Sequence, residues 1–101
     1  MNAEGLEMLK EIKGYVDTVT ERLIKADKCS NEEKVKELHV KFTEEFNRKH
    51  GTDIGWVTFY IMMDAWMEHY PANTLLSLTL DRMLEEFDGY LLYSLKVSGK
   101  L

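Results

Sequence analysis

Cysteine and proline are nearly absent from this chain, which has one of each among its 101 residues. Because Cys29 has no possible partner within the chain, the sequence excludes the disulfide framework of a small secreted domain. Acidic and basic side chains are interspersed near the first residue, where a signal peptide would have an uninterrupted apolar segment. We therefore expect a cytoplasmic protein.

Long hydrophobic runs and an excess of basic charge are missing as well. The most apolar window, residues 54–67, contains Asp64 and is too short to span a bilayer. Thirteen basic and eighteen acidic side chains give a net charge of −5. Nucleic acids and anionic membranes both attract basic surfaces, so this balance argues against each of them as a partner. We expect a protein that contacts neither nucleic acid nor membrane directly.

The sequence also lacks recognisable motifs of catalysis and metal binding. The chain has no glycine-rich phosphate loop and no nucleophile elbow. None of His39, His50 and His69 follows a glutamate by three residues, which is the spacing that carboxylate metal sites in helical bundles use. We expect these histidines to be partly exposed. We also expect a non-enzymatic protein with no catalytic residue, no metal and no cofactor.

Cys29 carries the only thiol in the chain. It follows Lys28 and precedes a predicted helix, and both features lower the pKa of a thiol. The sequence offers no redox or nucleophilic partner for it, so an incidental cysteine in a linker is the favoured interpretation.

Apolar residues at helical spacing fill most of the chain and predict an all-α fold. Short polar connections separate four such segments, so successive helices should lie antiparallel. We predict a single-domain antiparallel four-helix bundle over residues 1–101, with frayed residues at 97–101 and most of the core supplied by the third and fourth helices. The predicted helices cover residues 3–26, 31–50, 54–70 and 74–96.

Start and stop signals define the ends of these segments. Asn2 can cap the first helix, and Ser30 with Glu33 has the spacing of a capping box before the second. Gly51 suits the end of the second helix because glycine readily adopts the left-handed conformation. Gly89 is a place where the fourth helix could bend or break.

The first segment has an apolar seam with a period of 3.5 residues. Leu9, Val16 and Leu23 are seven residues apart, and the same spacing relates Ile12, Val19 and Ala26. Both an intermolecular coiled coil and packing inside a bundle leave this pattern, and we favour bundle packing.

The third segment is apolar almost all round. One face, which we predict to be core, consists of Trp56, Phe59, Tyr60, Met63, Trp66, Met67 and Tyr70. A strand is an alternative for residues 56–63, but the apolar pattern continues to residue 70, well beyond the five or six residues of an average strand. Val57, Ile61 and Ala65 make the opposite side partly apolar as well, so something must cover this helix on two sides.

We therefore predict a small protein–protein interaction module that acts as a regulator, adaptor or inhibitor. It would bind a protein partner, or a second copy as a homodimer, through apolar surface of the third and fourth helices. The candidate partner-binding residues are Val57, Ile61, Asp64, Ala65, Glu68, Leu75 and Leu78.

Two other functions are considered. A ligand- or metal-binding bundle would use the aromatic stripe from Trp56 to Trp66, with Asp64 and Glu68 as polar groups that would share a proton if both were buried. A helix-turn-helix protein would place its turn at residues 51–55. The helix after that turn has no lysine or arginine with which to read DNA, so this function ranks last.

Overall fold

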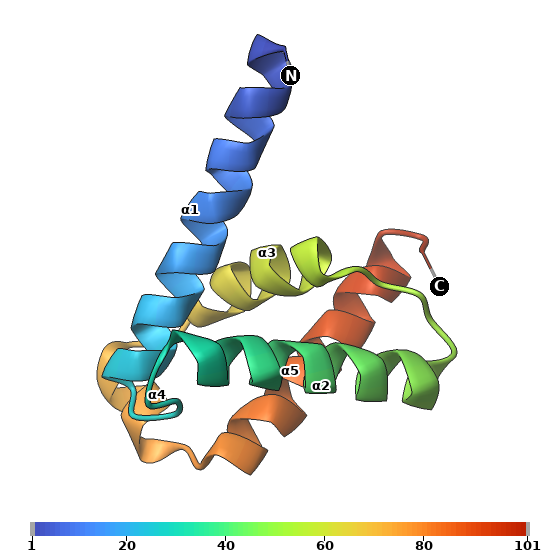
Figure 1. Cartoon of the computed structure of the whole chain (residues 1–101). Helices are drawn as coiled ribbons and strands as arrows, with labels where there is room; N and C mark the ends of the chain where they lie inside the picture. Colours follow the sequence, from blue (N-terminus) through green and yellow to red (C-terminus); the bar gives the residue numbers. More distant parts are fainter. Residues whose placement is uncertain (1, 101) are drawn as a thin grey trace.

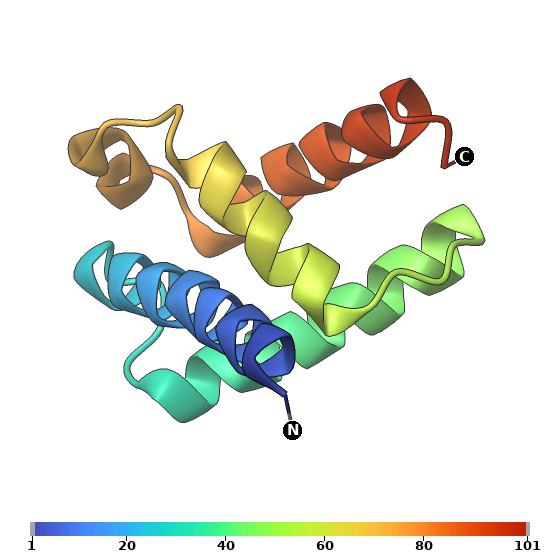
Figure 2. The ribbon, with the colours of Figure 1, turned by 90° about the horizontal axis from the view of Figure 1, so that it is seen from above.

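Five helices form the described part of the chain, and the third of them is central (Figures 1 and 2). The computed structural model of the chain describes residues 2–100, apart from the side chain of residue 72. The helices are α1 (Ala3–Lys25), α2 (Glu32–His50), α3 (Trp56–Met67), α4 (Ala72–Ser77) and α5 (Leu80–Val97), and the described residues include no strand. Because α3 packs against α1, α2 and α5, it is the helix that joins these three.

Side-chain caps explain where three of the helices begin. The Oδ1 atom of Asn2 accepts a hydrogen bond from the backbone N–H of Gly5 at 2.8 Å. Asn31 caps α2 in the same way, with 3.0 Å between its Oδ1 and the N atom of Lys34. The cap is therefore Asn31 and not the predicted Ser30. Serine and asparagine can both accept this hydrogen bond, and α2 begins one residue later than predicted, so Asn31 is the residue in the capping position.

The predicted fourth helix is divided in two, so the four-helix bundle is not confirmed. Leu78 is extended, and the hydroxyl of Thr79 caps α5 by accepting from the N–H of Arg82 at 3.1 Å. Lys28 donates to the carbonyl of Leu78, which has no helical partner at this break. In contrast, α5 is continuous through Gly89 and reaches Val97.

The turn after α5 is closed by backbone hydrogen bonds. Gly99 and Lys100 donate to the carbonyls of Lys96 and Leu95, at 3.1 and 2.9 Å. The predicted fraying at residues 97–101 stays a prediction, and residue 101 lies outside the described residues.

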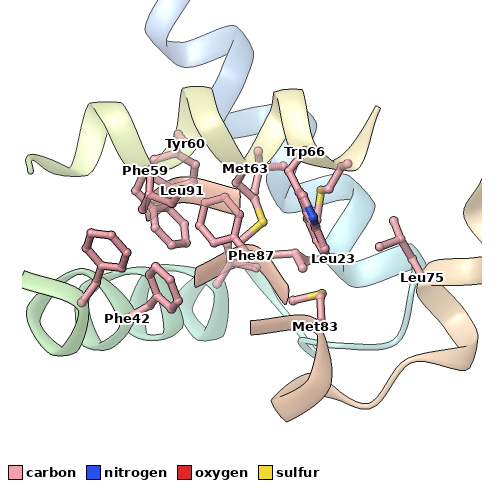
Figure 3. Close-up of a cluster of buried hydrophobic side chains, with 14 of the residues drawn as sticks. Leu23, Phe42, Phe59, Tyr60, Met63, Trp66, Leu75, Met83, Phe87 and Leu91 are labelled. Atoms are coloured by element: carbon pink, nitrogen blue, oxygen red, sulfur yellow. The ribbon is translucent and has the colours of Figure 1, made fainter. Parts of the chain in front are cut away.

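Buried aromatic and sulfur-containing side chains make up much of the core (Figure 3). Phe87 lies at its centre, with ring centroids 5.2 Å from Phe42, 5.5 Å from Phe59 and 5.7 Å from Trp66. Five core residues come from α3: Phe59, Tyr60, Met63, Trp66 and Met67. Trp56, predicted to belong to this face, is 52% exposed. It is the first residue of α3, and a helical side chain points back toward the N-terminus, so its indole lies beyond the edge of the core.

Two glycines allow a matched test of backbone conformation. Gly51 ends α2 with a φ of +64°, whereas Gly89 is an exposed helical residue with open space where a Cβ would be. We expect Gly51→Ala to lower the free energy of unfolding by about 1 kcal/mol because alanine is strained in the left-handed region. Gly89→Ala should raise it by up to about 1 kcal/mol because alanine is the better helix former. Urea unfolding measures both, and changes of equal sign would contradict this description.

No helix within residues 2–100 has both the length and the apolar character needed to cross a membrane.

Candidate interaction surface

The N-terminal half of α1 extends away from the other helices (Figure 1). The apolar seam of this helix is buried at its C-terminal end, where Val19 and Leu23 are fully covered. Toward the N-terminus it opens to solvent, so that Val16 and Ile12 are half-buried and Leu9 is 49% exposed. The seam predicted from the sequence is therefore packed along only part of its length.

The exposed part of the seam widens into an apolar stripe, which we call the α1 stripe. Its members are Leu6, Met8, Leu9, Ile12 and Tyr15. Since successive residues of an α-helix are rotated by about 100°, Lys10 and Lys13 lie along one edge of this stripe and Glu4 and Glu11 along the other. The projecting half thus has an apolar face with one basic edge and one acidic edge.

Local interactions keep this half helical. Glu4 is in the first turn, where a carboxylate stabilises the positive end of the helix dipole. Lys13 forms an ion pair with Asp17 at 2.8 Å, one turn further on. These contributions are small, and isolated helices shorter than about 12–15 residues are only marginally stable in water. Residues 3–14 therefore depend on these local interactions and on continuity with the anchored half of α1.

The structure separates the residues that the sequence nominated as a partner-binding surface. On α3, Ile61 is 37% exposed, Val57 and Ala65 are half-buried, and α1 lies beside the edge formed by Asp64 and Glu68. Leu78 is half-buried against the core. Leu75 is only 4% exposed and belongs to the core, where α4 folds back on the rest of the chain. Leu75 is therefore not part of the exposed surface.

Asp64 of α3 and Glu68, which caps the C-terminal end of that helix, do not form a buried pair. Asp64 is half-buried and Glu68 is exposed, and both line a surface hollow of about 330 Å³ whose opposite side is α1. Mutual burial, which would force one carboxyl to keep its proton, is not the arrangement found. Among residues 2–100, no cluster of three or more His, Cys, Asp or Glu side chains could hold a metal ion.

A second pocket of about 270 Å³ lies where α1, α3 and α4 meet. Met67, Tyr70 and Leu75 supply its apolar lining, with Arg22 and Lys25 among its other residues. Its volume is slightly below the range of about 300–1,000 Å³ that is typical of small-molecule sites. The aromatic stripe nominated as a ligand site does not line this pocket, because Trp66 is itself part of the core.

His39 is a buried group that the sequence analysis missed, since we expected it to be partly exposed. Its ring is 4% exposed and packs on the rings of Phe59 and Tyr60, with centroids 4.2 and 4.5 Å away. Its Nδ1 atom lies 3.4 Å from the hydroxyl of Thr43, and its Nε2 atom has no hydrogen-bond partner among the described residues. Burial lowers the pKa of His39 from 6.5 to about 4, so the imidazole is neutral at pH 7.

The other histidines and the cysteine have surface or structural positions. His50 lies 3.0 Å from a carboxylate oxygen of Asp88 and joins the end of α2 to α5, whereas His69 is exposed. Cys29 is half-buried, and burial raises the pKa of its thiol. This shift is opposite to the one predicted from Lys28 and the nearby helix, because desolvation disfavours the thiolate.

A groove of about 500 Å³ lies between α2 and α5, and we call it the α2–α5 groove. Its apolar residues are Leu38, Phe42, Phe46, Leu80 and Leu84. The charged side chains differ between its two walls. Lys41, Glu45 and Lys49 stand on the α2 wall, and Asp81, Glu85 and Asp88 stand on the α5 wall. The groove is therefore apolar inside, with charges of both signs on the α2 wall and only carboxylates among the charged groups of the α5 wall. One charge from each wall is already paired, since Lys49 lies 3.7 Å from a carboxylate oxygen of Asp88.

The charge spacing along α2 is visible in the sequence, but the groove is not. Lys41, Glu45 and Lys49 recur every four residues and so share one side of the helix. Nothing in that spacing shows that α5 lies opposite them. Comparison of the chain with protein-family models, curated proteins and solved structures finds no match.

Proposed function

We propose that this chain is a small non-enzymatic protein–protein interaction module that binds through the α1 stripe. One observation carries the proposal: a helix that is anchored at one end projects an apolar face into solvent at the other. The proposed binding surface is thus on the first helix and not on the third and fourth helices, where the sequence predicted it. Val57 and Ile61 of α3 remain secondary candidates, because they are partly exposed.

The energetics support a partner at this position. Burying a large apolar side chain completely contributes about 1.5–3 kcal/mol, so each half-exposed residue of the α1 stripe would contribute roughly half of that. Several such residues on one face can offset the cost of association and of ordering side chains. An exposed apolar stripe with charged edges is also the pattern of helices that bind in hydrophobic grooves.

The proposal is tested by placing charge on the stripe. We expect the double variant Leu6→Glu/Leu9→Glu to lose binding to its protein partner while its stability changes by less than about 0.5 kcal/mol, because both side chains are half-exposed. The measurements are co-precipitation from an extract of the native host, sedimentation velocity and urea unfolding.

The control is Val40→Glu, which places one glutamate on another exposed apolar residue, in α2. Val40→Glu should bind and sediment like the unmodified chain. If the stripe variant also behaves like the unmodified chain in both assays, the α1 stripe is not the binding surface.

A ligand-binding bundle remains the second function. It is the weaker proposal because Phe59, Met63 and Trp66 fill the space that an aromatic ligand site would need. Its nominated carboxylates, Asp64 and Glu68, lie instead at the edge of α3 beside α1.

A further inference from the structure

The pocket where α1, α3 and α4 meet lies outside both the α1 stripe and the α2–α5 groove. We infer that this pocket binds a free α-amino acid with an apolar side chain. Its lining combines a buried apolar floor with one cation and one anion that have no partner among the described residues. The inference goes beyond the proposed function, because the pocket is at the anchored end of α1 and not on the projecting half.

The floor of the pocket is apolar. Ala26, Met67 and Leu75 are 4%, 1% and 4% exposed, and they come from the end of α1, from α3 and from α4. Tyr70 adds its ring, while its hydroxyl donates to a carboxylate oxygen of Glu86 at 3.5 Å. An aliphatic group that enters the pocket therefore contacts carbon and sulfur, and its burial is favourable.

The rim of the pocket is charged. Arg22 is half-buried and Glu68 is exposed, and both line the pocket. Among residues 2–100, neither of these two side chains belongs to an ion pair. Lys25 is also in the lining, but its ammonium is 2.7 Å from a carboxylate oxygen of Glu21. The rim thus offers one guanidinium and one carboxylate that are still unpaired.

A zwitterion pairs with both of these groups at once. The carboxylate of an amino acid can accept two parallel hydrogen bonds from the Arg22 guanidinium, and its ammonium can donate to Glu68. The side chain of the amino acid then extends over the apolar floor. A fatty acid would leave Glu68 unpaired beside its hydrocarbon chain, and an alkylamine would leave Arg22 unpaired. A chain terminus has only one of the two charges, so the ligand is a free amino acid.

The size of the pocket agrees with this ligand. Its volume of about 270 Å³ is slightly below the range of about 300–1,000 Å³ that suits drug-sized molecules, and a free amino acid is smaller than those. The charged rim is partly in solvent, so its ion pairs contribute little affinity. We expect a dissociation constant of about 1 mM.

Titration of the full chain with leucine tests the inference. Leucine should shift the methyl NMR signals of Met67 and Leu75, which lie in the floor, and leave that of Leu91 unchanged. Three related compounds remove one feature each: isocaproate has no ammonium, isoamylamine has no carboxylate, and glycine has no apolar side chain. Each of them should bind at least about tenfold more weakly than leucine, because a hydrogen bond to a charged group or a buried alkyl group is lost.

Two variants assign each charge of the ligand to a residue. Arg22→Gln and Glu68→Gln should each raise the dissociation constant of leucine about tenfold. Glu68→Gln should not weaken isocaproate, which has no ammonium for that residue to bind. Arg22→Gln should likewise not weaken isoamylamine, which has no carboxylate. Such paired comparisons isolate the contact between one residue and one ligand group.

The matched controls are Arg48→Gln and Glu44→Gln, which make the same chemical changes at exposed positions of α2. Both should bind leucine like the unmodified chain. Unshifted Met67 and Leu75 signals at about 10 mM leucine would overturn the inference, and so would isocaproate or isoamylamine binding as tightly as leucine. Neither result bears on the α1 stripe, whose test is the loss of a protein partner by Leu6→Glu/Leu9→Glu.

Discussion

Replacing Phe87 with alanine is expected to lower the free energy of unfolding by about 4 kcal/mol, the largest effect of any single substitution considered for this chain. Phe87 is fully buried, and its ring meets those of Phe42, Phe59 and Trp66. Alanine would lose these contacts and leave a cavity between α2, α3 and α5 that rigid aromatic neighbours cannot close. Since domains of this size are stable by about 5–15 kcal/mol, much of the total would be lost.

Equilibrium unfolding in urea measures this loss, with Tyr93→Ala as the control on the same helix. Tyr93 is exposed, so its truncation should change the free energy of unfolding by less than about 0.5 kcal/mol. Phe87→Leu keeps most of the apolar volume and should fall between the two. A loss below about 2 kcal/mol for Phe87→Ala would mean that the ring is not at the centre of the core.

Acid is expected to destabilise this protein over an unusual range, between pH 6.5 and pH 4, because of His39. Its pKa is about 4 in the folded chain and 6.5 when unfolded, so the unfolded state binds more protons between these values. The contribution of neutral His39 to the free energy of unfolding is therefore fully present above pH 6.5, and it is lost as the pH falls from 6.5 to 4. At 1.36 kcal/mol per pKa unit, the full loss is about 3 kcal/mol.

The variant His39→Phe isolates this effect from other titrations. Phenylalanine has no proton to bind, so the fall in stability between pH 6.5 and pH 4.5 should largely disappear. It also removes the unpaired Nε2 atom, which should raise stability at pH 7 by about 1 kcal/mol. Urea unfolding across this pH range is the measurement, with His69→Gln as an exposed control that should keep the unmodified profile. An unchanged profile for His39→Phe would assign the acid sensitivity to other groups.

Helix content and the limits of α1 and α2 could be predicted from the sequence to within one residue. The signals are local: Asn2 caps one helix, Gly51 ends another, and apolar residues recur at helical spacing in between. The predicted core face of α3 was also confirmed apart from Trp56 and the half-buried Tyr70. Capping and periodicity depend only on neighbours along the chain, so they can be read without knowing the fold.

The partner-binding surface could be predicted only in part. Ile61 and Val57 were correctly identified as lying off the core face of α3, and both keep some exposure. Leu75 was nominated on the same reasoning, but it is buried. The chain breaks between α4 and α5 at Leu78, and α4 packs the side chain of Leu75 into the core. An apolar residue off the main face of one predicted helix can become core when that helix is divided.

The sequence by itself determined an all-helical chain, the limits of α1 and α2, and an apolar face on each predicted helical segment. Only the tertiary structure decided what covers those faces. It leaves half of the α1 seam in solvent, encloses His39 among aromatic rings, and sets α2 and α5 apart so that a groove lies between them. The physical reason is that periodicity identifies which face of a helix is apolar but not which surface packs against it, because that surface is formed by residues distant in the chain.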